Sequence, residues 1–373
     1  MPKRIIIFLL QWLLLAPFVV FAGDPPSRAG ADGPHVFYKG KKIIVHSVVI
    51  EDSLPVARKS VFRRRHDVLL TCTVPATGDA FTFGLMDTII PPPSRWPATT
   101  APILALSDIE GNFKGFKMML LGAGVMDESF NWTFKNGHLV LLGDYFDRGT
   151  QVTECLWLAY KLDMEARAAG GAVHFILGNH EVMNLSGDFR YVIPKYMENA
   201  RLIGERYHTW YTDNTELGRW LRSKNAVECI GDVFFCHGGL SPQMAALTTD
   251  LELINDTARK WYGEKYIPSE HPLAAAIFDG DYGIFWYREM SKNKLKIETV
   301  RATFERFGAQ HVVVGHTLVP EVRTSYEGLL VCIDLFHEDH IRQGFMNTLL
   351  IEKGRWWVVD TSGKRSAIAS TLH

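Results

Sequence analysis

Two aspartates and an arginine follow directly after an apolar run in the middle of the chain. The aliphatic run Leu139–Leu142 ends at Gly143, and Asp144, Asp147 and Arg148 come next. A short aliphatic run ended by glycine predicts a buried strand in a sheet that is covered on both faces. Carboxylates this close repel each other unless a cation lies between them or a base pairs with one of them. Taken alone, the loop is equally compatible with a helix cap and a surface ion pair.

The same arrangement occurs at four more places, in each case an aliphatic run followed by Asp, Glu, Asn or His. The runs and the polar residues after them are 103–106 with Asp108 and Glu110, 173–177 with Asn179 and His180, 233–236 with His237, and 312–314 with His316. The carboxyl ends of such strands are where α/β folds place ligands. Divalent metals such as Mn and Fe accept mixed carboxylate, amide and imidazole ligands. These strand ends together therefore predict a metal site.

Four motifs in this order make the chain similar to the calcineurin-like metallophosphoesterases: Gly-Asp-x-x-Asp-Arg-Gly, Gly-Asn-His-Glu, His-Gly-Gly and Gly-His-Thr. Two further stretches, 178–191 and 281–288, resemble the Shewanella-like branch of the phosphoprotein phosphatases. The resemblance covers the chain from about Ile103 to the C-terminus. It implies an α/β fold whose core is a two-sheet β-sandwich flanked by helices.

The resemblance also implies a centre of two divalent metal ions. Its protein ligands would be Asp108 and Glu110 on the first ion, Asp144 as the bridge, and Asn179, His237 and His316 on the second. This family usually has a histidine where this chain has Glu110. A binding Glu110 would add a hard oxygen ligand, which favours Mn, Fe or Mg over Zn, although Zn stays possible. The alternative is that Glu110 does not bind, which would leave the first site weak.

The same resemblance assigns the catalytic roles. His180 would be the general acid that protonates the leaving oxygen, and Asp147 would orient its imidazole and raise its pKa. The expected phosphate-binding side chains are Arg148, Arg288 and, as a third candidate, Arg190. A planar guanidinium matches phosphate oxygens well. For Arg288 the alternative is stacking on Trp286.

The N-terminus has the order of a cleaved signal peptide, residues 1–22. Lys3 and Arg4 precede the apolar run Ile5–Phe21, and the small residue Ala22 follows. We therefore expect a secreted or periplasmic protein with no stable membrane span after cleavage, although an uncleaved anchor is the alternative. Cleavage would remove two positive charges and change the formal net charge from −1 to −3. A chain so near neutrality has no general electrostatic footprint for nucleic acid.

The remaining chain divides into three parts by composition. We expect an accessory antiparallel β domain at 35–90, a stiff Pro-rich linker at 91–102 and a catalytic domain at 103–373 with a helical cap region at 185–230. Within the catalytic domain we expect helices at 113–121 and 150–169 and a hairpin at 348–360. The chain has five cysteines. Because none has metal-finger spacing and their number is odd, we expect no essential disulfide.

The function that these observations favour is hydrolysis of phosphate monoesters by attack of a metal-bridging hydroxide. Phosphoproteins or phosphopeptides would be the substrates, on phosphotyrosine, phosphoserine or phosphothreonine. The first alternative is a broad-specificity phosphomonoesterase or a nucleotide-polyphosphate hydrolase with the same chemistry. The second is a non-catalytic exported binding module, which would have no need of His180 or Arg148.

Overall fold

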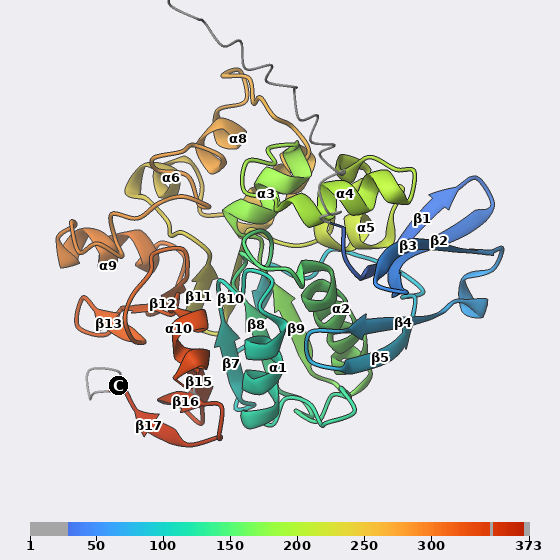
Figure 1. Ribbon diagram of the computed structural model, residues 1–373. Helices are drawn as coiled ribbons and strands as arrows, with labels where there is room; N and C mark the ends of the chain where they lie inside the picture. Colours follow the sequence, from blue (N-terminus) through green and yellow to red (C-terminus); the bar gives the residue numbers. More distant parts are fainter. Residues whose placement is uncertain (1–28, 344–345, 369–373) are drawn as a thin grey trace, which may run out of the picture.

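Two six-stranded sheets lie face to face in the computed structural model, which describes residues 29–343 and 346–368 (Figure 1). The first sheet has the spatial order β17 (Arg365–Ala367), β16 (Arg355–Asp360), β15 (Asn347–Glu352), β7 (Ile103–Leu106), β8 (His138–Leu141) and β9 (Ala172–Phe175). The second has the order β13 (Arg323–Ser325), β14 (Leu330–Cys332), β12 (His311–Val314), β11 (Val233–Cys236), β10 (Val227–Ile230) and β6 (Arg95–Trp96). The predicted signal peptide lies outside the described residues.

Alternating side chains explain why these aliphatic runs form a sandwich. Ala105, Val140 and Val313 belong to one buried apolar cluster. Their sequence neighbours Leu104 and Leu141 belong to a second, larger cluster. Because successive side chains of a strand point to opposite faces, one cluster fills the space between the sheets and the other lies under the helices.

Within residues 29–343 and 346–368, ten α-helices flank the sandwich. Figure 1 shows how they lie around the two sheets. They are α1 (Phe113–Gly122), α2 (Val152–Ala168), α3 (Asn179–Ser186), α4 (Pro194–Leu202), α5 (Glu216–Arg222), α6 (Pro242–Leu247), α7 (Leu251–Trp261), α8 (Pro272–Ile277), α9 (Ile297–Glu305) and α10 (His337–Arg342). Two short 3-10 helices occur at Arg65–Asp67 and Tyr207–Tyr211. The predicted fold class, a two-sheet core flanked by helices, is confirmed. The two predicted helices and the hairpin also form, with ends shifted by one or two residues.

The N-terminal segment has the expected antiparallel strands. These are β1 (Asp32–Lys39), β2 (Lys42–Glu51) and β3 (Leu54–Phe62) in one sheet, and β4 (Leu69–Val74) and β5 (Asp79–Gly84) in another. Their apolar side chains belong to the same cluster as those of α2. Trp157 of α2 lies 4.9 Å from the ring of Phe83 and donates a hydrogen bond of 2.7 Å to the carbonyl of Pro34. The segment therefore shares its core with the rest of the chain.

The Pro-rich stretch 91–102, predicted to be a stiff linker, contributes a strand to the second sheet. Its residues Arg95–Trp96 form β6, which pairs in parallel with β10. Asn225 donates hydrogen bonds of 3.3 and 3.2 Å to the carbonyls of Pro92 and Pro93. Proline is tolerated at a sheet edge because its missing N–H is not needed there. The stretch is thus an extended edge of the second sheet, and the last residues of the predicted cap region form its neighbour β10.

The sequence also predicts no stable membrane span after cleavage and no essential disulfide. No helix within 29–343 or 346–368 combines the length and apolarity that crossing a membrane requires. All five cysteines, Cys72, Cys155, Cys229, Cys236 and Cys332, are buried free thiols.

Candidate metal centre

The carboxyl ends of neighbouring parallel strands bring the predicted ligands together. Strands β7 and β8 pair in parallel, and so do β11 and β12. Asp144, His237 and His316 each offer a ligand atom within 4.8 Å of the others. The Nε2 atom of His237 lies 3.2 Å from Oδ2 of Asp144 and 3.0 Å from Oδ1 of Asn179. Asp108 lies beside them, since its Oδ2 accepts a hydrogen bond of 3.1 Å from the backbone N–H of His316.

The backbone of this region is held in an uncommon conformation. Positive φ angles occur at Asp108 (54°), Glu110 (49°), Asp144 (56°), Asp147 (67°), Arg148 (54°) and His316 (61°). Residues other than glycine avoid this left-handed region, and strained positions gather at functional sites. Six of the predicted site residues therefore share a feature that a purely structural loop seldom shows.

Two glycines of the motifs are required by close approach to the ligands. A Cβ atom on Gly315 would lie 1.9 Å from Oγ of Ser107 and 2.6 Å from Oδ2 of Asp108. A Cβ atom on Gly178 would lie 2.3 Å from Oδ1 of Asp144. Any larger residue at these positions would push the carboxylates away from their places.

The donor set fits a divalent metal. Nε2 of His316 is buried and, among the described residues, has no hydrogen-bond partner. Nδ1 of His237 lies 2.6 Å from the carbonyl of Leu142, which directs Nε2 toward the carboxylates. Burial opposes a charge on His237, yet Asp144 and then Asp108 raise the pKa of His237 to about 10. The carboxylates thus favour a positive charge between them, and mixed oxygen and nitrogen donors suit Mn, Fe or Zn.

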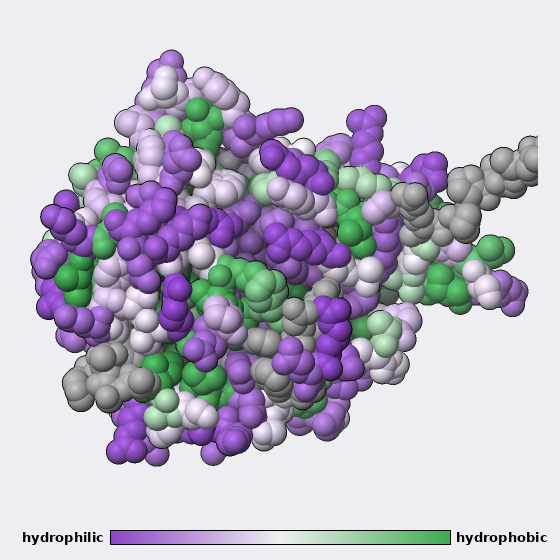
Figure 2. All heavy atoms as spheres, turned by 60° about the vertical axis from the view of Figure 1, so that its left-hand side comes forward, coloured by the Kyte–Doolittle hydropathy of each residue, from purple (hydrophilic) through white to green (hydrophobic). Residues whose placement is uncertain are grey.

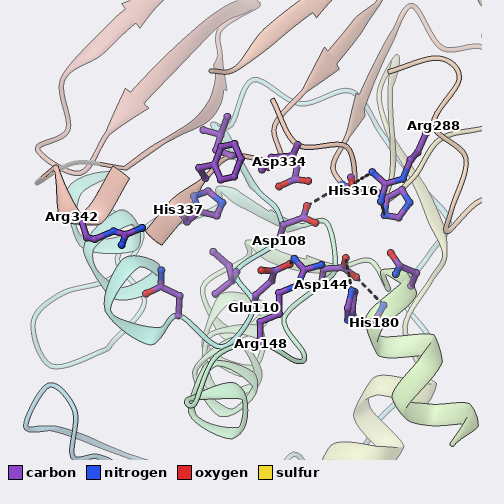
Figure 3. Close-up of a pocket in the computed structure, with 16 residues that line it drawn as sticks. Asp108, Glu110, Asp144, Arg148, His180, Arg288, His316, Asp334, His337 and Arg342 are labelled. Carbon is purple, nitrogen blue, oxygen red and sulfur yellow. Dashed lines mark hydrogen bonds and ion pairs between the residues drawn. The ribbon is translucent and has the colours of Figure 1, made fainter. Parts of the chain in front are cut away.

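Glu110 lies in this structure against an arginine. It forms an ion pair with Arg148 at the edge of the cavity, where Figure 3 shows the two side chains next to each other. Its side chain is 22 % exposed, whereas that of Asp144 is 4 % exposed. The structure therefore brings Glu110 to the centre, with its carboxylate engaged by Arg148.

His180 has the partner that the sequence assigned to it. Its Nδ1 atom lies 2.6 Å from Oδ2 of Asp147. Asp147 in turn accepts hydrogen bonds from Asn184, whose Oδ1 accepts one of 2.8 Å from the hydroxyl of Tyr207. Burial opposes a charge on His180, but the hydrogen bond to Asp147 and the charge of Asp144 raise the pKa of His180. This chain of contacts leaves Nε2 of His180 facing Asp144, at 4.0 Å from its Oδ2.

Sequence reasoning missed the role of Glu181. Its fully buried carboxylate accepts hydrogen bonds from the backbone N–H groups of Asp144, Tyr145 and Gly178, at 2.8, 2.7 and 2.7 Å. It thereby ties the loop after β8 to the start of α3. Glu181 could have been identified from its place in the Gly-Asn-His-Glu motif, next to the predicted ligand Asn179. A carboxylate buried at such a position must be surrounded by hydrogen-bond donors.

A further buried carboxylate of the site, Asp334, was also missed. It is 6 % exposed and lines the same cavity as Asp108, Asp144 and His316. Burial and then the charges of Asp108 and Asp144 raise the pKa of Asp334 to about 9. The signal was present in the sequence, because Asp334 follows the apolar run 329–333 in the way that the predicted ligands follow theirs.

The three predicted arginines have different surroundings. Arg148 lines the cavity with a side chain that is 58 % exposed. Arg288 also lines it, and its guanidinium contacts the carbonyl of His316 and the hydroxyl of Thr317. Arg190 is not among the residues that line the cavity and pairs with Asp188 at 2.5 Å. Arg342 of α10, which sequence reasoning did not identify, does line it.

The cavity has a volume of about 560 Å³ and an apolar side. Leu318 and Phe336 line it and are 43 % and 50 % exposed. In the space-filling view, hydrophobic side chains lie beside strongly hydrophilic ones near the centre of the face (Figure 2). Tyr191, which is also exposed, has its ring 5.2 Å from that of His180. A substrate in the cavity would thus meet both carboxylates and imidazoles and apolar side chains.

A two-sheet sandwich with carboxylates, an amide and imidazoles at the strand ends defines a class of enzyme, the metal-dependent phosphoester hydrolases. Residues 101–320 match the profile of the calcineurin-like phosphoesterases, and the chain belongs to that family. The resemblance noted in the sequence is thereby confirmed.

Named relatives come from several organisms. Shewanella-like protein phosphatase 1 of Plasmodium berghei (strain Anka) is 30 % identical over 225 residues, which cover 58 % of this chain and 61 % of that protein. Shewanella-like protein phosphatase 2 of Arabidopsis thaliana is 26 % identical over 268 residues, which cover 58 % of this chain and 66 % of that protein. The chain thus spans less than two thirds of the length of these two relatives.

A solved structure matches nearly the whole chain. The cold-active protein-tyrosine phosphatase of a psychrophilic Shewanella species superposes with a TM-score of 0.80 and 31 % sequence identity. The superposition covers 92 % of this chain and 100 % of that one. The similarity therefore includes the N-terminal strands, which the family profile does not reach.

Proposed function

We propose that this protein is a two-metal phosphatase that removes phosphate from phosphoproteins. The observation that carries the proposal is the arrangement around His180. A structural metal site has no use for an imidazole held 2.6 Å from Asp147 and directed at the bridging position of Asp144. A phosphate ester needs such a proton donor for its leaving oxygen.

Two bound divalent ions would acidify a water and neutralise the oxygens of the phosphoryl group. Asn179, His237 and His316 would hold one ion, Asp144 would bridge, and Asp108 with a further carboxylate would hold the other. His180 would deliver its proton to the leaving oxygen, and Asp147 would keep Nδ1 protonated so that Nε2 carries the transferable proton. Arg148 and Arg288 would bind the remaining phosphate oxygens.

The surroundings of the cavity favour an aromatic phosphate ester among phosphoproteins. Phe336 and Leu318 line the cavity and are half exposed, and Tyr191 stands beside His180. An aryl group that follows its phosphate into the centre would bury apolar surface on these side chains. The Shewanella protein of similar structure is a protein-tyrosine phosphatase, which supports the same choice.

A substrate panel tests this function. Metal-stripped protein is supplied with Mn, Mg, Fe or Zn and given phosphotyrosyl and phosphoseryl peptides of one sequence, a plain phosphate ester and a dinucleotide polyphosphate. We expect the highest kcat/KM on the phosphotyrosyl peptide, with Mn or Fe, and loss of that activity in His180→Ala. A dinucleotide hydrolysed faster than every peptide would favour the nucleotide-polyphosphate alternative. Activity unchanged in His180→Ala would refute the assigned chemistry.

We further propose that the protein acts outside the cytoplasm. The support is the order of residues 1–22: basic start, apolar middle, small residue at the end. Sequencing the N-terminus of protein recovered from the medium or periplasm is the test, and we expect it to begin near Gly23. Protein that retains Met1 and stays with the membrane would indicate an anchor instead.

A further inference from the structure

The first ion of the proposed centre would have two clear protein ligands, Asp108 and Asp144, and its third protein ligand remains to be assigned. Asp108 and Asp144 both line the cavity. The motif offers Glu110 as the third, in place of the usual histidine. In the structure, however, the carboxylate of Glu110 is paired with Arg148. A carboxylate that binds a guanidinium holds its oxygens in a fork geometry that competes with binding a metal.

Asp334 is placed at the other side of the same position by strand register. Strand β14 pairs in parallel with β12, with Cys332 opposite Val314. Asp334 and His316 each come two residues after this pair. Their side chains therefore lie next to each other at the carboxyl ends of the two strands. The backbone is fixed there, because Val319 N–H donates to the carbonyl of Asp334 at 2.9 Å and Ile333 N–H donates to that of Val314 at 2.9 Å.

The carboxylate of Asp334 lies near the positive groups His237 and Arg288 but forms an ion pair with neither. Figure 3 shows it in the cavity, next to the carboxylate of Asp108. Among the described residues, no ion pair within 4 Å and no hydrogen bond reaches its side chain, although the residue is only 6 % exposed. Burying a carboxylate without a partner is costly, and such groups are usually paired or bind metals. The buried Nε2 of His316, a ligand of the second ion in this proposal, also has no partner among the described residues, so the same cavity holds a second polar group that a cation would satisfy.

We propose that Asp334 supplies the third protein ligand of the first metal ion, and that Glu110 instead positions Arg148 for phosphate. This inference rests on the proposed two-metal function and deepens it. The first site is then built from the carboxylates of Asp108, Asp144 and Asp334, which are hard oxygen donors. Such a set binds Mn or Mg in preference to softer ions. The second site, with Asn179 and two imidazoles, keeps the mixed character that Fe or Zn accepts.

The test measures metal binding directly in the full chain. Asp334→Asn, Glu110→Gln and wild type are stripped and titrated with Mn, and bound ions per chain are counted by mass spectrometry. Electron paramagnetic resonance reports whether two Mn ions are magnetically coupled. The exposed Asp213→Asn, whose side chain is 84 % exposed, is the matched control for losing one carboxylate.

We expect wild type, Asp213→Asn and Glu110→Gln to bind two coupled ions. In Asp334→Asn one of the two affinities should fall by more than about 10-fold, since even the outer partners of metal ligands change affinity by about 10- to 100-fold. The coupled signal should give way to that of an isolated ion. Two coupled ions with unchanged affinity in Asp334→Asn would overturn the inference, and so would loss of one ion in Glu110→Gln alone.

A second variant keeps the test decisive if Asp334→Asn does not fold. Asp334→His puts an imidazole at the same place, and we expect it to bind two ions with a preference shifted from Mn toward Zn. A preference identical to that of wild type would count against Asp334 as a ligand. The outcomes also separate the two proposals. Two bound ions without phosphatase activity in wild type would reject the function, whereas an active two-ion Asp334→Asn would reject only the ligand.

Discussion

Two clusters among the described residues each combine a pair of histidines with at least one carboxylate, and one of the two resembles a metal centre. In the first, His237 and His316 stand with Asp108 and Asp144 at the carboxyl ends of strands. The second lies at the start of β8 and in β9. There His138 Nδ1 is 2.8 Å from Nε2 of His174, whose Nδ1 is 2.6 Å from Glu228.

The two clusters differ in what remains unsatisfied. Glu228 also accepts hydrogen bonds from Trp96 at 3.1 Å and from Asn225 at 2.9 Å, so each of its oxygens has a partner. Within the described chain, none of the residues of this second cluster has a positive φ angle. The metal centre instead has an orphaned imidazole nitrogen, crowded carboxylates and left-handed backbone. The comparison teaches that residue types alone do not make a metal site. A metal site is indicated by buried ligand atoms that have no hydrogen-bond partner or counter-charge within the protein.

The largest expected effect is that of Asp144→Asn. Because this carboxylate would bridge both ions, its loss should reduce kcat/KM by more than about 10,000-fold, the upper end of what a single general acid contributes. Steady-state kinetics and metal counting on one preparation check this. An inactive variant that still binds two ions would mean that Asp144 is not the bridge.

His180→Ala comes next and tests chemistry apart from structure. We expect kcat to fall by about 100- to 10,000-fold, most strongly for esters with poor leaving groups, because these need the donated proton. Thermal unfolding in the presence of Mn should change little. If good and poor leaving groups suffered equally, His180 would not be the general acid.

Arg148→Ala should have a smaller effect. Hydrogen bonds to charged groups contribute about 1.5–3 kcal/mol, which corresponds to about a 10- to 100-fold loss in kcat/KM. Inhibition by inorganic phosphate should weaken in parallel, and metal content should stay the same. Loss of an ion in this variant would contradict the role in phosphate binding.

Glu228→Gln should reduce stability and leave activity unchanged, the opposite of the effect expected for the metal-centre variants. We expect the free energy of unfolding to fall by about 1–3 kcal/mol, because a buried donor of His174 or Trp96 loses its charged partner. kcat/KM should stay at the wild-type value once metal is supplied. Denaturant unfolding and kinetics on the same sample check both parts, and a change in metal content would show that the two clusters are coupled.

The smallest effect concerns pH. Burial and then the neighbouring His174 lower the pKa of His138 from 6.5 to about 4. Between these values the unfolded chain binds a proton that the folded chain does not, so stability is complete above pH 6.5 and falls as the pH decreases toward 4. Urea midpoints measured across this range should show the slope, and His138→Gln should reduce it. An equal slope in both proteins would contradict the assignment to His138.

Much of the centre could be predicted because short, local sequence patterns specify it. An aliphatic run ended by glycine forms a buried strand, and parallel strands deliver the residues after them to one edge. That reasoning identified Asp108, Asp144, Asn179, His237 and His316, and the structure brings them together. The same reasoning missed Asp334, because its run 329–333 has the same form but belongs to none of the four motifs.

Only the tertiary structure decided the partners of individual side chains. That Glu110 pairs with Arg148, that Arg190 pairs with Asp188, and that 91–102 forms a sheet edge depend on contacts whose geometry no local pattern specifies. The same holds for Asp334, which reaches Asp108 only through the register of β14 on β12. A sequence determines which strands end in ligands because alternation and glycine act over a few residues. Which oxygen then faces the cavity depends on the whole packed chain.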